Sequence, residues 1–166
     1  MKKNILIIVF CCVLCLSLSS CFEDNKIVFD QVKLVELEDA VKRTPAAGAK
    51  FPIISVNRGN TTQNLQVNLI GTHLKSAEVL KFSIDTTISA FLNANTIRAV
   101  EGVHFSLNGG EFTLKSDTSF ATMSFNILDP GQNAGKSALL LLKLDGNSTL
   151  KPNENYRRVG YRINLN

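Results

Sequence analysis

The sequence predicts an all-β protein, a single antiparallel β-sandwich of about seven to nine strands. Apolar and polar residues alternate over many short runs, as they do in strands with one face in a core and one in water. Turn-forming residues separate these runs, at Gly71, Gly109-Gly110, Asp129-Pro130-Gly131 and Asp145-Gly146-Asn147. A barrel and an α+β fold are the alternatives.

The first strands follow from local composition. Residues 27–38 mix β-branched and charged residues and are expected to form one strand or two short ones. Pro45 and Gly48 mark residues 42–50 as a loop. The next strand covers residues 51–57, where Pro52 suits an edge strand or a first strand position, because proline cannot donate a ladder hydrogen bond.

The later strands show the alternation most clearly. Their inward residues fall within residues 65–69, 80–84, 112–114, 121–127, 140–144 and 159–165. In the last run, Tyr161 is in register with the core residues Val159 and Ile163. Only residues 86–98 have a composition that allows a helical turn.

The amino-terminal residues predict an export signal. Lys2 and Lys3 precede an unbroken apolar run at residues 5–16. This run fits a signal-peptide core and is shorter than the roughly 20 residues needed to cross a bilayer. Its removal leaves residues 21–166, enough for one domain with a self-sufficient core. It also lowers the formal charge from +4 to +2, and this near-neutral body gives no basis for nucleic-acid binding.

The apolar run ends at Leu18-Ser19-Ser20-Cys21. These residues resemble the lipobox of bacterial lipoprotein precursors, in which a branched apolar residue and two small residues precede a cysteine. The resemblance implies that the chain is cut before Cys21 and that its acylated thiol is the membrane anchor. Two or three acyl chains anchor a protein stably, whereas one is marginal.

Cysteine usage agrees with this interpretation. All four cysteines lie within residues 1–21, so the exported domain contains no disulfide and depends on its core. Because Cys11, Cys12 and Cys15 lie in the same region, a plain secretory signal with a chance cysteine is the alternative. The expected organisation is a signal peptide (1–20), a lipidated cysteine with a tether (21–26) and a sandwich domain (27–166).

Glu23 and Asp24 follow the predicted anchor. An acidic pair at this place resembles the surface-export signal of Bacteroidetes lipoproteins, which implies a lipid-anchored protein exposed on the outer membrane. An ordinary solvated tether and a periplasm-facing protein are the alternatives.

Residues 79–128 carry a second resemblance. They contain a strand, a small residue, an acidic residue followed by glycine, an aromatic residue that starts a strand, a glycine turn, and a long strand ending near an aspartate. These features fall on Ala99, Glu101-Gly102, Phe105, Gly109-Gly110, Phe112 and Asp129. The pattern is similar to that of the Calx-beta-like, immunoglobulin-type sandwich domains found in uncharacterised Bacteroidetes lipoproteins. The resemblance implies a fold but says almost nothing about activity, because one fold can have many functions.

Two departures from that pattern matter. Residues 86–98 lengthen the usual connector. The acidic clusters of the calcium-binding members are missing, since Asp129 is followed by Pro130 and Gly131, whereas calcium needs about six to eight oxygen ligands. No metal is therefore expected. His73 and His104 belong to no zinc motif and are expected on strand surfaces.

No catalytic residue is predicted. No serine lies in a GxSxG elbow, and no phosphate loop or dinucleotide fingerprint is present. Glu36 and Glu38 lie on the same side of a predicted strand, where a solvated face is the simpler interpretation than a glycosidase pair. The chain is accordingly predicted to need no cofactor and not to be an enzyme.

The candidate contact residues are few. Arg158 and Arg162 share the outward face of the last strand and form a candidate stripe for a partner or an anion, because arginine binds carboxylates well. A charged face that blocks edge aggregation is the alternative. Thr86 lies in Asp85-Thr86-Thr87, which resembles the Asp-Thr-X acceptor used for O-glycosylation in the same bacterial lineage.

Exposed aromatic rings commonly bind sugars, but the chain has no Trp. Tyr156 and Phe91 are the rings that remain, and Phe91 is expected to plug residues 86–98 over one end of the sandwich. The sequence thus predicts a non-catalytic cell-envelope lipoprotein, an interaction or structural module with an envelope protein or a glycan as its partner. The alternatives are a glycan-binding accessory of a polysaccharide-uptake system and a hydrolase with an unplaced carboxylate site.

Overall fold

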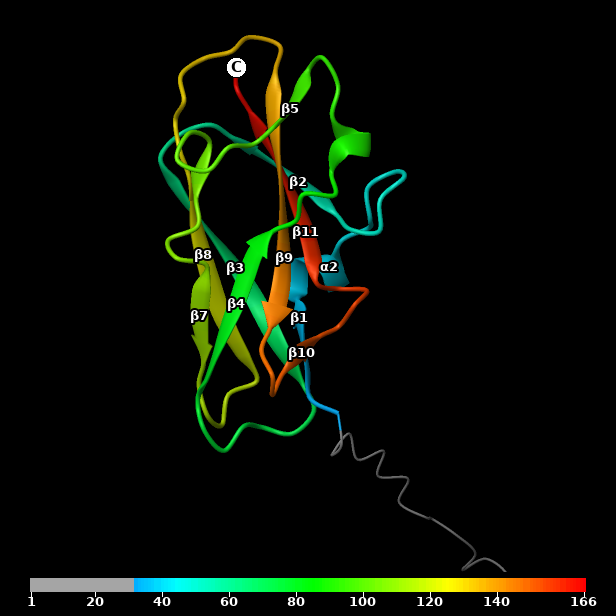
Figure 1. Cartoon of the computed structure of the whole chain (residues 1–166), viewed down its shortest axis with the longest axis vertical. Coiled ribbons are helices and arrows are strands. Elements are labelled where there is room, and N and C mark those ends of the chain that lie inside the picture. Colours follow the sequence, from blue (N-terminus) through cyan, green and yellow to red (C-terminus); the bar gives the residue numbers. More distant parts are fainter. Residues whose placement is uncertain (1–31) are drawn as a thin grey trace, which may run out of the picture.

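Two β-sheets pack face to face in the computed structural model, which describes residues 32–166 (Figure 1). The predicted signal peptide, the lipobox, Cys21, Glu23 and Asp24 lie outside the described residues. No helix within residues 32–166 has both the length and the apolar character needed to span a bilayer.

The first sheet has five strands, in the order β10 (Lys151–Pro152), β1 (Leu34–Leu37), β3 (Thr61–Ile70), β8 (Phe120–Ile127) and β6 (Phe105–Ser106). The second has the order β2 (Ile53–Asn57), β11 (Arg158–Asn164), β9 (Ser137–Gly146), β4 (Glu78–Ile84) and β7 (Glu111–Leu114), with β5 (Thr96–Arg98) also paired to β9. Eight of these described strands have four residues or more, and they confirm the predicted sandwich.

Most strand pairs are antiparallel, as predicted, but three are parallel. These pairs are β1 with β10, β2 with β11, and β5 with β9. The prediction of an edge strand after Pro52 is confirmed, because β2 lies at the margin of the second sheet. The Pro52 carbonyl accepts a hydrogen bond from the Gly160 amide, so the residue is joined to β11 although it has no N–H of its own.

The main core lies between the two sheets and contains the inward residues of the alternating runs. Phe105, Phe125 and Leu140 are fully buried there. The predicted core position of Tyr161 is confirmed, since its ring contacts Phe125 edge-on with 4.9 Å between centroids. Burial raises the pKa of the Tyr161 hydroxyl, which is consistent with a ring enclosed by apolar neighbours.

A second, smaller apolar cluster covers the outer face of the second sheet. Leu139 and Leu141 point away from the main core and are nevertheless fully buried. Phe51 and Ile88 cover them, and Phe91 packs edge-on against Phe51 at 5.5 Å. The predicted plug at Phe91 therefore covers a sheet face and not an end of the sandwich. Residues 86–98, whose composition allowed a helical turn, contain the 3-10 helix η1 (Ser89–Phe91).

One element was not predicted. The first strand ends at Leu37, and the short helix α2 (Glu38–Lys42) follows it. Glu38 and Asp39 lie in its first turn and pair four residues onward with Lys42 and Arg43. Acidic residues at a helix start and basic residues at its end are favourable, so local charge pairing ends the strand where alternation alone suggested that it continued.

Candidate functional site

A solvent-open groove of about 450 Å³ is the candidate contact site. Its lining residues come from the loop between α2 and β2 and from the segment that leads from β10 into β11. They are Pro45, Ala49, Lys50, Glu154, Asn155 and Arg158. The groove therefore combines cationic, anionic and amide groups with the apolar side chains of Pro45 and Ala49, which suits a partner with both polar and apolar groups.

Local turn chemistry builds both walls of the groove. In the first wall, the breaker Gly48 adopts φ +75°, a conformation that glycine adopts at no steric cost. In the second, the Asn153 side-chain oxygen accepts the amide of Asn155, and the Asn153 carbonyl accepts the amide of Tyr156. The Asn153 amide group also donates to Glu36 at 3.1 Å, which fastens this loop to β1.

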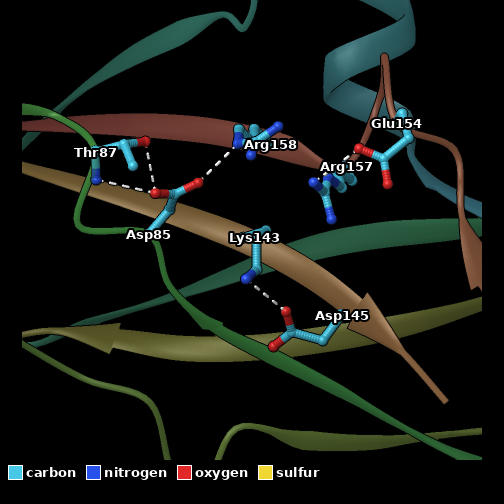
Figure 2. A network of polar contacts seen from close by, with 7 residues as sticks. All are labelled: Asp85, Thr87, Lys143, Asp145, Glu154, Arg157 and Arg158. Atoms are coloured by element: carbon cyan, nitrogen blue, oxygen red, sulfur yellow. Dashed lines mark hydrogen bonds and ion pairs between the residues drawn. The ribbon is translucent and has the colours of Figure 1, made fainter.

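An ion pair beside the groove positions Arg158 (Figure 2). The Arg158 Nε donates to Asp85 Oδ2 at 2.7 Å, and the Asp85 side chain is almost fully buried. The other Asp85 oxygen accepts the Thr87 hydroxyl at 2.6 Å and the Thr87 amide at 2.9 Å. Burial by itself raises the pKa of Asp85, but the bonds from Thr87 and Arg158 outweigh burial and lower that pKa to about 2. Arg158 is thus held in place by a permanent anion.

Further pairs extend this polar face. Lys143 and Asp145 pair along β9 at 3.0 Å, and Arg157 pairs with Glu154 at 2.7 Å (Figure 2). Lys50 belongs to none of the ion pairs formed among residues 32–166. The groove therefore offers Lys50 as a cation whose charge is not already matched within the described part of the chain.

The structure separates the two arginines of the predicted stripe. Arg158 lies in the groove wall and is paired with Asp85. Arg162 is exposed four residues farther along β11, opposite Ser55 and Leu139, and does not line the groove. A stripe that binds a partner or an anion stays a prediction. Its two arginines differ, because Arg158 is paired with Asp85 in the groove wall whereas Arg162 lies outside the groove.

Thr86 has an exposed side chain, while its backbone is held in place. Its carbonyl accepts two bonds from the Arg98 guanidinium, both at 3.2 Å. The neighbouring Asp85 is buried and bonded as described above. O-glycosylation at Thr86 stays a prediction.

The two histidines differ. His73 is exposed, as predicted, and its Nε2 lies 2.9 Å from the Ser119 hydroxyl. The prediction for His104 was wrong, because this side chain is buried and its Nδ1 accepts the Val100 amide at 3.0 Å. Residues 100–104 form a turn and not a strand, so alternation did not apply to them. Burial lowers the pKa of His104, which keeps the ring neutral at physiological pH.

The close carboxylates Glu36 and Glu38 have separate partners. Burial raises the pKa of Glu36, which accepts the Asn153 amide group. Bonds from Lys42 and Asn68 lower the pKa of Glu38. Within residues 32–166, no three His, Cys, Asp or Glu side chains come together in an arrangement that could hold a metal ion.

Comparison with solved structures defines the class of fold. The chain is a Calx-beta-like β-sandwich, which confirms the fold implied by residues 79–128. It matches the apo-form Calx CBD1 domain with a TM-score of 0.56 and 9% identity, over 81% of this chain and 97% of that one.

Two proteins of unknown function from Bacteroides ovatus have the same fold. One has a TM-score of 0.56 and 22% identity, over 78% of this chain and 44% of that one. The other has a TM-score of 0.50 and 13% identity, over 80% of this chain and 45% of that one. The chain thus spans less than half the length of these two proteins. No protein-family model and no curated protein matches it.

Sequence reasoning identified Arg158 but missed the other residues that build the site. Asp85 and Arg158 are 73 residues apart, and no pattern relates them. The Asp85-Thr86-Thr87 sequence does contain one local signal, because an aspartate often accepts the amide two residues onward, and it does so here. Lys50 and Asn155 carry no comparable signal, since both are ordinary loop residues.

Proposed function

We propose that the protein is a lipid-anchored, non-catalytic interaction module of the cell envelope, displayed on the outer membrane. The observation that carries the proposal is the lipobox-like Leu18-Ser19-Ser20-Cys21 at the end of a short apolar run that follows two lysines. An apolar run of this length exports a chain without anchoring it, so the acylated Cys21 would supply the anchor.

The groove beside Arg158 supports the interaction role. It combines Lys50, Arg158, Glu154 and Asn155 at the surface, and an ion pair with the buried Asp85 holds Arg158 there. Groups fixed in this way bind with little ordering cost. The buried titratable side chains Asp85 and His104 are both bonded within the fold, which supports a structural role for them and not a catalytic one.

Replacing the anchor residue tests the proposal. Cys21→Ala is expected to move the protein from the membrane fraction to the soluble fraction, because no acyl chain can then be attached. Fractionation of cells that express the full chain, followed by detergent phase partition, measures this. Cys15→Ala is the matched control and is expected to leave the protein in the membrane fraction. A Cys21→Ala protein that still partitions with membranes would contradict the anchor.

A glycan is the second candidate partner, and the position of Tyr156 favours it. This ring follows the groove residues Glu154 and Asn155 directly and is 37% exposed. An amphipathic ring next to amide and charged groups is a common sugar-binding arrangement. If a glycan binds here, Tyr156→Ala should weaken binding to it by about tenfold or more, whereas Val100→Ala, at a turn remote from the groove in sequence, should not. An empty glycan-array screen of the full chain would contradict this candidate.

A further inference from the structure

One end of the sandwich brings together segments that are far apart in the sequence. Here β1 begins, β3 ends, β4 begins and the loops at residues 71–77, 115–119 and 147–150 meet (Figure 1). Leu34 lies opposite both Ile70 and Lys151 in the first sheet. The Asp117 amide donates to the Leu74 carbonyl at 3.1 Å, which joins two of the loops. We call this region the entry end, because the described chain enters the fold there at Val32.

The entry end has an apolar strip on the outer side of the first sheet, in which Leu34 and Ile70 are half-buried and Phe120 is exposed. Val35 and Leu37 point into the core, so Leu34 points outward, and it is paired with Ile70. Phe120 lies opposite Asn68, two residues before Ile70, and is therefore a diagonal neighbour of Ile70 on the same face. Phe120 is 56% exposed, the largest exposed fraction among the large apolar side chains of residues 32–166.

The same end has an excess of positive charge. Lys75, Lys115 and Lys151 are exposed in its loops or beside them, and Lys33 is half-buried before β1. Glu78 and Asp117 oppose these lysines in the loops, and Glu36 lies on the same outward face as Leu34, opposite Asn68. Glu78 is bonded to Asn147 and Glu36 to Asn153. None of the four lysines takes part in an ion pair among the described residues.

The opposite end also has more cations than anions. Arg58 pairs with Asp129 at 2.6 Å, and Lys136 and Glu101 carry opposite charges there. Arg98 and Arg162, both beside Leu139 near the start of β9, add two further positive charges. The entry end is therefore distinguished by exposed Phe120 beside lysines, and not by its net charge.

We propose that the entry end docks against an anionic bilayer surface, with Phe120 and its apolar neighbours entering the interface and the lysines facing lipid phosphates. This inference rests on the proposed anchor at Cys21. Ten residues lie between Cys21 and Val32, so eleven residue steps of about 3.3–3.6 Å each keep the entry end within about 40 Å of the bilayer. Apolar side chains beside lysines bind such an interface through burial and through attraction to anionic lipids.

A tryptophan reporter tests the docking. The chain has no Trp, so Phe120→Trp places a single reporter at the entry end, and Val100→Trp, at a site 50% exposed in the turn before β6, is the matched control. Full-length lipidated protein is reconstituted in vesicles of phosphatidylcholine and phosphatidylglycerol with brominated acyl chains. Flotation measures attachment to the vesicles, and fluorescence quenching measures the depth of each ring.

We expect a blue shift and strong quenching for Phe120→Trp and little change for Val100→Trp. Quenching should fall when Lys75, Lys115 and Lys151 are replaced by Gln, when phosphatidylglycerol is omitted, and at high salt. The unlipidated Cys21→Ala form of Phe120→Trp should emit in buffer as an exposed ring.

Three results would overturn the docking. Equal quenching of the two reporters in vesicles that float with the protein contradicts the docking and leaves the anchor standing. A protein that does not float contradicts the anchor, and the docking with it. Blue-shifted emission from the unlipidated form shows that the chain itself covers Phe120.

Discussion

At the scale of single residues, the most informative side chain is Asp85. It is buried at the end of β4 and is stabilised as an anion by Thr87 and Arg158, with its pKa lowered to about 2. Removing one partner of such a pair leaves the other poorly solvated, so the pair matters more than an exposed one. The ion pair also joins the start of β11 to the end of β4, across β9.

We expect Asp85→Asn to lower the free energy of unfolding at pH 7 by on the order of 2 kcal/mol. The pKa of Asp85 is lower in the folded state than its ordinary value of 3.8. Its contribution is therefore complete above about pH 4 and is lost as the pH falls towards 2. Urea unfolding of both proteins from pH 7 to pH 2 measures this, and the difference between them should shrink over the acid range.

Asp129→Asn is the control for this prediction. Asp129 also pairs with an arginine, Arg58, but it is exposed to solvent, so its loss should change stability little. If Asp85→Asn and Asp129→Asn lowered the free energy of unfolding equally, burial of Asp85 would not strengthen its ion pair with Arg158.

At the scale of elements, residues 86–98 act as a cover for β9. β4 pairs with the last part of β9, and β5 runs back in the opposite direction and pairs with its first part. The residues between them place Ile88 over Leu139 and Leu141. β9 is consequently buried on both faces, as its apolar run at residues 138–142 requires.

Ile88→Ala should lower the free energy of unfolding by about 2–5 kcal/mol, because Ile88 is only 1% exposed and its loss leaves a cavity over β9. The amides of Asp85 and Ala99, which donate to the Leu141 and Leu139 carbonyls, should exchange hydrogen faster. Chemical unfolding and amide exchange measure both effects. Val100→Ala, at an exposed site, is expected to change the free energy of unfolding little. If it lowered that free energy as much as Ile88→Ala does, the conclusion that residues 86–98 cover β9 would be contradicted.

At the scale of the whole molecule, the sandwich has a polar groove and an entry end where exposed Phe120 lies beside lysines. The proposed anchor and the docking surface both concern the entry end, where β1 starts (Figure 1). Docking there would fix the orientation of the groove relative to the membrane. Surface sorting through Glu23 and Asp24 stays a prediction, since these residues lie outside the described part of the chain.

Much of the fold could be predicted because its strands are half-buried. Alternation identified the inward faces of β3, β8 and β11, including Tyr161, since a strand with one face in water must alternate. It failed where that condition does not hold. β9 is buried on both faces, His104 lies in a turn, and α2 is stabilised by pairs of charges four residues apart.

The candidate site was far less predictable than the fold. The sequence identified Arg158 as a contact residue but placed it in one stripe with Arg162. The structure instead pairs Arg158 with Asp85 and brings it next to Lys50 and Asn155. Such neighbours come from different loops, and nothing in the local sequence specifies which loops meet.

The sequence by itself determined the sandwich class, the inward face of most strands and the prediction of an anchor at Cys21. These depend on local periodicity and on a short contiguous motif. Only the tertiary structure decided the parallel pairs, the cover over β9, the Asp85–Arg158 pair and the gathering of lysines with Phe120 at the entry end. The physical reason is that each of these joins residues far apart in the chain, whose contact is set by how the two sheets pack.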